Sequence, residues 1–168
     1  MSTKKAIVKH IEGVTFTGKS DSNHWVMMDG PEEFGGTNAA ARPKELLLLA
    51  LGGCTASDVI SILTKKRVRL DGFEVHLSAE QVETHPQVYK SIHLEYRFIG
   101  TNIKTKDVER AIELSQEKYC PVTAMLNKSV EITHSYRIEA PAKPEVVDLT
   151  ALGWQMEEVS NKKKEPVM

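Results

Sequence analysis

The stretch RPKELLLLALGGCTASDVISILTKKR, residues 42–67, constrains the fold more than any other part of the chain. Pro43 in a first helical turn, with Glu45 near the positive end of the helix dipole, predicts a helix that starts there and runs to about Lys66. From Leu46 to Ala56 the side chains are apolar or small on every face. This pattern is typical of a helix packed on all sides, so we expect a central, buried helix.

Two glycines and a cysteine, Gly52, Gly53 and Cys54, stand in the middle of this helix. A helical glycine costs about 1 kcal/mol relative to alanine, so the pair gives up roughly 2 kcal/mol unless something requires it. Without these side chains, another helix could approach Cys54 closely, or a small substrate could bind beside the sulfur at Gly53. Both interpretations stay open on the residues alone, and plain helix packing is the simpler one.

Composition excludes several classes of protein. The 168 residues suit one domain with its own core, and 22 Lys+Arg against 23 Asp+Glu leave no positive excess for nucleic acid. The N-terminus lacks the apolar segment of a secretory signal, and nothing in the chain approaches the ~20 apolar residues of a membrane span. We expect a cytoplasmic protein that binds neither nucleic acid nor a membrane.

The flanking segments predict an α+β fold. Short β-type runs separated by Gly13 and a polar turn predict an antiparallel meander over the first thirty residues. Residues 30–41, rich in glycine and small side chains, predict a loop that could carry these strands to another subunit. Further along come two alternating strands, an amphipathic helix, a short helix and a last strand, at residues 73–79, 92–100, 105–119, 121–128 and 130–138.

The chain has two cysteines, Cys54 and Cys120, in neither a CxxC motif nor a zinc-type cluster. Cys120 precedes Pro121 at the start of the short helix, whose free N–H groups favour a thiolate. Cys54 has no such help, and Asp58 one turn further on would oppose its ionisation, so an activating charge must come from elsewhere or from a partner chain. In a reducing compartment the two thiols are either inert or a redox pair that cycles.

RPKELLLLALGGCTASDV, followed after two strands and a helix by YCPVTAMLNKSVEI, resembles the OsmC/Ohr family of osmotically induced and organic-hydroperoxide-resistance proteins. The LGGCTA sequence resembles one branch of that family in particular. The resemblance covers residues 3–139, which suggests an OsmC-like domain at 1–139 and a partly mobile extension at 140–168.

The resemblance implies an intertwined homodimer, with antiparallel sheets wrapped around two central Cys-bearing helices. It also implies a thiol peroxidase for organic hydroperoxides, in which Cys54 becomes a sulfenic acid and Cys120 resolves it as a disulfide. A dithiol, such as a lipoyl-bearing protein, would reduce the disulfide, and the reaction needs no metal or organic cofactor.

The family's peroxidases pair an arginine from the N-terminal strands with a glutamate ten positions before the reactive cysteine. Here Lys44 occupies that position, Glu45 follows it, and no arginine precedes Arg42. We therefore take Glu45 as the candidate catalytic carboxylate, and Arg42, Lys44 and Lys19 as candidates for substrate binding together with Gly53. Because lysine lacks the planar fork of arginine, two alternatives stay open: a weakly reactive small-ligand-binding or redox-sensing protein, and a structural role for both sulfurs.

Overall fold

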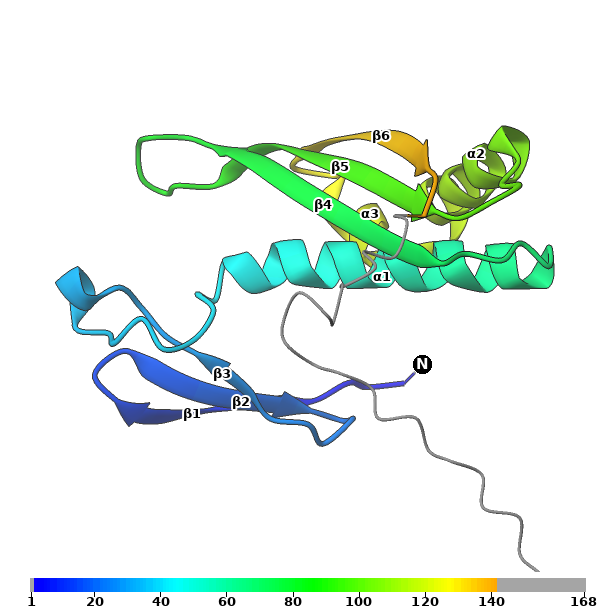
Figure 1. The fold of residues 1–168 in the computed structure, drawn as a ribbon. Helices are drawn as coiled ribbons and strands as arrows, with labels where there is room; N and C mark the ends of the chain where they lie inside the picture. The colour runs from blue at the N-terminus through cyan, green and yellow to red at the C-terminus, as the bar shows by residue number, and fades with distance from the viewer. Residues whose placement is uncertain (1, 142–168) are drawn as a thin grey trace, which may run out of the picture.

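The computed structural model describes residues 2–141, in which a long central helix separates two small sheets (Figure 1). The chain is thus a mixed α+β protein, as the sequence predicts. The predicted extension at 140–168 lies, from residue 142 onward, outside the described residues. The elements are β1 (Ala6–Glu12), β2 (Thr15–Ser20), β3 (Val26–Met28), η1 (Glu32–Phe34), α1 (Glu45–Lys65), β4 (Gly72–Gln81), β5 (Tyr89–Ile99), α2 (Thr105–Leu114), η2 (Ser115–Tyr119), α3 (Pro121–Leu126) and β6 (Glu131–Glu139).

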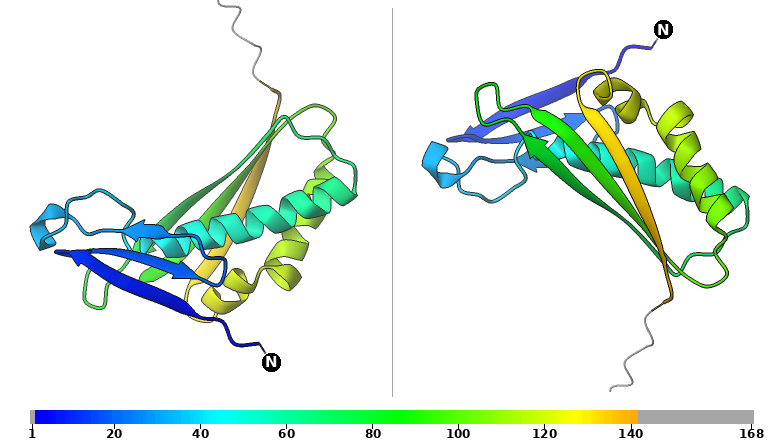
Figure 2. Two further views of the ribbon diagram at one scale, coloured as in Figure 1. Left: turned by 90° about the horizontal axis from the view of Figure 1, so that it is seen from below. Right: turned by 90° about the horizontal axis from the view of Figure 1, so that it is seen from above.

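The N-terminal strands form the predicted antiparallel meander, in the order β1-β2-β3. Gly13 makes the turn between β1 and β2 with a φ of +53°, a conformation that favours glycine. All of β1 is exposed, including Val8, which is 61% accessible. This sheet lies on the opposite side of α1 from the second sheet (Figures 1 and 2). Its apolar side chains, among them Ile7 and Ile11, are exposed in the single chain.

The loop between β3 and α1 is organised around Asp29, a buried carboxylate. It accepts hydrogen bonds from the Thr15 hydroxyl, the Thr37 amide and hydroxyl and the Ala39 amide, at 2.7–3.1 Å. The Thr37 hydroxyl is the main reason that the pKa of Asp29 lies far below its usual value, and backbone amides add to the effect. The charged carboxylate therefore stabilises the loop that connects the N-terminal sheet to α1.

Asp29→Asn is expected to lower the melting temperature at pH 7 and to make it less sensitive to acid. The depressed pKa means that ionised Asp29 stabilises the fold above the unfolded pKa of about 3.9, and that this contribution disappears as the pH falls further. Thermal melts should show a gap between wild type and variant at pH 7 that narrows towards pH 3. Asp21→Asn, at a surface aspartate paired with Lys4, is the matched control, and equal gaps at both pH values would contradict the expectation.

Helix α1 spans Glu45–Lys65, close to the predicted range, but it is not buried on all sides within one chain. One face is in the core, with Leu51, Val59 and Leu63 almost inaccessible. The opposite face exposes apolar side chains, among them Leu49 at 62%. The expectation of burial on every face is therefore wrong for a single chain, because apolar composition does not say which chain supplies the neighbour.

The two glycines of α1 lie in different surroundings. A Cβ at Gly52 would come 2.7 Å from Leu77 Cδ1, so this glycine allows α1 to pack closely on β4. A Cβ at Gly53 would meet nothing within 4 Å. Close packing within the chain accounts for Gly52 and leaves Gly53 on the open face.

Among residues 2–141, α1 is the one helix long and apolar enough to cross a membrane by length and composition alone. The sequence analysis expects no segment of this kind, and the structure corrects that expectation for α1. Thr, Ser and Asp interrupt the apolar run, but the mean hydropathy of the helix stays as high as that of a membrane span. One such helix is weak evidence for a membrane span, since an apolar core helix has the same length and composition. Asp58 in its middle is hydrogen-bonded to Ser115 of the same fold.

The second sheet has the order β4-β5-β6 and packs on α1 (Figures 1 and 2). Strands β4 and β5 are antiparallel, whereas β6 runs parallel to β5, so the expectation of antiparallel sheets is corrected for this pair. The segment α2-η2-α3 between them is long enough to bring the chain back to the same end of the sheet, which a parallel pair requires. The inward residues of β5 are the alternating Ile92, Leu94, Tyr96 and Phe98 of the sequence prediction.

Candidate functional site

The two cysteines, 66 positions apart in the chain, meet beside α1. The sulfurs of Cys54 and Cys120 and the carboxylate of Asp58 provide three atoms that all lie within 4.8 Å of one another. Both thiols are free, Cys54 half-buried and Cys120 only 3% accessible. A disulfide would require the two sulfurs to approach from within 4.8 Å to about 2.05 Å.

The wide turn before Cys120 places it in this position. Helix α2 continues into η2, a π-helical segment that ends with the Cys120 amide donating to the Ser115 carbonyl at 2.9 Å. Pro121 then opens α3, and Cys120 is its N-cap, with extended backbone and a sulfur that accepts a bond from the Thr123 amide at 3.4 Å. The sequence predicts this N-cap, but nothing in it marks the π-helical turn.

Cys54 is not activated within one chain. Burial raises the pKa of the Cys54 thiol, as do its hydrogen bond with Cys120 and the nearby Asp58 charge, while the Val122 amide partly opposes them. This agrees with the sequence expectation that an activating charge must come from elsewhere. A thiolate at Cys54 would therefore require a cation that is not provided by its immediate neighbours.

The cationic candidates are engaged at other places. The Lys19 amino group bonds to Asn23 at 2.6 Å and lies 5.0 Å from the centre of the Trp25 ring, in the N-terminal sheet. The Lys44 amino group bonds to the Gln81 side chain and lies 5.1 Å from the centre of the Tyr89 ring. Neither contact brings a charge to Cys54.

Glu45 is paired with Arg42 at the start of α1. The Arg42 amide donates to Glu45 at 3.0 Å and its guanidinium at 3.1 Å, and these bonds lower the pKa of Glu45. Since Cys54 follows Glu45 by nine positions along the helix, the two lie ~13 Å apart along the axis. Arg42 and Glu45, the candidate residues at the start of the helix, thus pair with each other and lie away from the Cys54 sulfur.

A buried hydrogen-bond network adjoins the cysteine pair. The Thr55 hydroxyl lies 2.7 Å from the Tyr96 hydroxyl and 2.8 Å from that of Ser115, and Gln116 donates to Tyr96 at 2.6 Å. Ser115 donates in turn to Asp58 at 3.1 Å. The sequence analysis assigns no role to Thr55, and the available signal is that Thr55 is the one hydroxyl side chain between Leu46 and Ala56.

The family model for "OsmC-like protein" matches residues 36–135, which include both cysteines. The chain belongs to the OsmC-like family. Protein YhfA of Escherichia coli strain K12 is 44% identical over 136 residues, 81% of this chain and 98% of that protein.

Solved structures of OsmC-like proteins share the fold. A hypothetical protein from Aquifex aeolicus is 30% identical with a TM-score of 0.73, over 84% of this OsmC-like chain and 99% of that one. An organic hydroperoxide resistance protein from Legionella pneumophila is 17% identical with a TM-score of 0.61, over 81% of this chain and 97% of that one. The second match, at its low identity, speaks for the fold alone.

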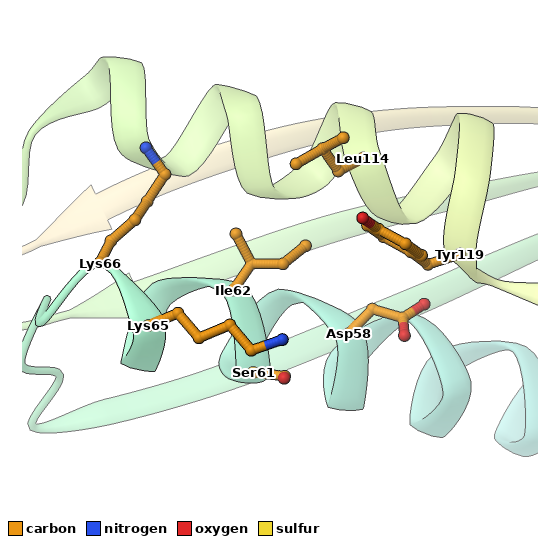
Figure 3. A pocket seen from close by; sticks show the side chains of 7 residues that line it. All are labelled: Asp58, Ser61, Ile62, Lys65, Lys66, Leu114 and Tyr119. Atoms are coloured by element: carbon orange, nitrogen blue, oxygen red, sulfur yellow. The ribbon is translucent and has the colours of Figure 1, made fainter.

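Two cavities of this OsmC-like domain adjoin the site elements. One of about 380 Å³ lies between α1 and η2, with Asp58, Lys65 and Tyr119 on its wall (Figure 3). The other, of about 460 Å³, is mostly apolar and is lined by Leu47 of α1, Val88 of the loop between β4 and β5, and residues of α3 and the start of β5. The first cavity reaches the carboxylate beside the cysteines, and the second suits an apolar molecule.

Proposed function

We propose that this OsmC-like protein is a thiol peroxidase that reduces organic hydroperoxides through Cys54, with Cys120 as the resolving cysteine. The observation that carries the proposal is the close approach of the two sulfurs, which lie within 4.8 Å in a fold shared with hydroperoxide resistance proteins. A sulfenic acid needs a second thiol within reach to be resolved quickly, and Cys120 is that thiol.

The reaction balances with the two thiols and one hydroperoxide. The Cys54 thiolate attacks the O–O bond, which breaks to leave the alcohol after protonation and Cys54 as a sulfenic acid. The Cys120 thiol then displaces water from that sulfur to form the disulfide. A dithiol, such as a lipoyl group, reduces the disulfide by exchange and becomes oxidised itself.

The proposal includes a homodimer, because the single chain leaves complementary surfaces uncovered. The exposed face of α1 and the exposed strand β1 both carry apolar side chains, and a second copy could cover them. A partner would also offer the cation that Cys54 lacks. Lys19, Arg42 and Lys44 are the proposed sources, with Glu45 as their carboxylate partner and Gly53 as the open point beside Cys54.

A second candidate is a small-ligand-binding or redox-sensing protein on the same scaffold. The raised pKa of Cys54 favours it, because a thiol that stays protonated reacts slowly with peroxide. The apolar cavity beside α1 would hold the ligand. In both cases we propose residues 1–139 as the OsmC-like domain, 140–168 as an extension, and the cytoplasm as the location, since free thiols suit a reducing compartment.

Stopped-flow mixing of the reduced full-length protein with an alkyl hydroperoxide tests the proposal. We expect one equivalent of peroxide to remove two titratable thiols per chain, at least ~10-fold faster than it oxidises free cysteine at the same pH. Dihydrolipoamide should restore both thiols and sustain turnover. Thiol loss no faster than that of free cysteine would reject the peroxidase and leave the ligand-binding candidate.

A further inference from the structure

Asp58 has no role in the proposed peroxidase, yet it completes a cluster that the sequence does not reveal. Cys54 and Asp58 are four residues apart on α1, so they share one face of the helix. Cys120 reaches the same place from the loop before α3. The three potential ligand atoms lie within 4.8 Å of one another, although the sequence contains no CxxC motif that would predict a metal site.

We propose that the reduced protein binds a zinc ion through Cys54, Cys120 and Asp58. Two thiolates and a carboxylate are ligands that Zn²⁺ takes in tetrahedral sites. At the usual bond lengths, the ligand atoms of such a site are about 3.5–3.8 Å apart. A contraction of at most ~1.3 Å from the present arrangement reaches that spacing, which side-chain rotation can provide.

The surroundings of Asp58 support a ligand role. Ser115 donates to Asp58 Oδ2 at 3.1 Å, which orients the carboxylate, and Thr55 bonds to Ser115 in turn. Within residues 2–141 no hydrogen bond reaches Asp58 Oδ1. Partners of this kind commonly orient metal ligands. Asp58 forms no salt bridge with a lysine or arginine anywhere in residues 2–141, so the stretch of chain that the structure describes offers it no neutralising ion pair.

Cys120 has a similarly prepared environment. Its sulfur accepts the Thr123 amide, and the Thr123 hydroxyl is buried without a hydrogen-bond partner among the described residues. A buried free hydroxyl calls for an explanation, and a bound ion or its water would provide one. The cavity between α1 and η2 has Asp58 on its wall, with Tyr119 above it in Figure 3, so a fourth ligand would have space on the Asp58 side of the cluster.

Binding would hold both sulfurs as thiolates and release their two protons to solvent. The inference does not depend on the proposed peroxidase, since it requires only reduced thiols and involves no oxidant. It does predict competition with oxidation, because a disulfide removes two of the three ligands.

Anaerobic titration of the reduced full-length protein with Co²⁺ as a spectroscopic probe is the test, followed by displacement with Zn²⁺. We expect one Co²⁺ per chain, a thiolate-to-cobalt charge-transfer band, visible bands of a tetrahedral site, and loss of the charge-transfer band in Cys54→Ser. Asp58→Asn, with its fold checked by circular dichroism, should weaken Zn²⁺ binding by ~10-fold or more. Glu113→Gln, at an exposed carboxylate of α2, is the matched control and should bind as wild type.

The absence of a charge-transfer band in protein with two titratable thiols would overturn the inference. So would Zn²⁺ affinity that is unchanged in both Asp58→Asn and Cys54→Ser. The metal titrations are done without peroxide, and the peroxidase assay is done with a chelator that removes metal. A negative result in one experiment is therefore independent of the result in the other.

Discussion

Cys54→Ser is expected to abolish peroxide consumption, whereas Cys120→Ser is expected to keep the first chemical step and lose the disulfide. Removing the nucleophile of a covalent enzyme costs at least about three orders of magnitude in rate, and we expect a loss of that size for Cys54→Ser. In Cys120→Ser the thiol that lies within 4.8 Å of Cys54 is gone, so the sulfenic acid should accumulate.

Mass spectrometry, after a 1,3-diketone has trapped any sulfenic acid, distinguishes the oxidation products of the two variants. Wild type should show an intramolecular disulfide, Cys120→Ser a trapped sulfenic acid on Cys54, and Cys54→Ser neither. Each variant is the matched control for the other, because serine replaces one sulfur and leaves the remaining structure alike. A disulfide that joins two Cys54 residues of different chains in wild type would contradict the role given to Cys120.

Leu49→Glu is expected to convert a homodimer into monomers. Leu49, Gly53 and Ile60 follow one another at helical spacing on the exposed face of α1, where Leu49 is 62% and Ile60 38% accessible in the single chain. In a symmetric dimer the substitution occurs twice, and each unpaired buried charge costs several kcal/mol. The dissociation constant of the dimer should therefore rise by ~100-fold or more, as measured by analytical ultracentrifugation over a range of concentrations.

Met125→Glu is the matched control, since Met125 is equally exposed at 63% but lies on α3, away from that face. Gly53→Ala adds a second measurement. On a free helix surface it should stabilise the protein by about 1 kcal/mol, whereas against a partner helix the new methyl group should destabilise it. A monomeric wild type, or stabilisation by Gly53→Ala, would argue against the dimer.

Much of the fold could be predicted because its signals are local. The start and end of α1, the meander at the N-terminus, the alternating strand β5 and the N-cap at Cys120 all follow from periodicity, proline position and turn residues that act within a few positions. The direction of β6 could not be predicted in this way, since it depends on how α2, η2 and α3 return the chain to the sheet.

The sequence by itself determined a long apolar helix with a cysteine in its middle, a second cysteine at a proline-led helix start, and the family these motifs belong to. Only the tertiary structure decided that Asp58 joins the two sulfurs, that Ser115 and Thr55 hold it, and that one face of α1 stays open. Local patterns fix which residues form a helix and which of its faces are apolar. Contacts between residues 60 or more positions apart, such as Thr55 and Ser115, depend on how whole elements pack, and no short stretch of sequence encodes them.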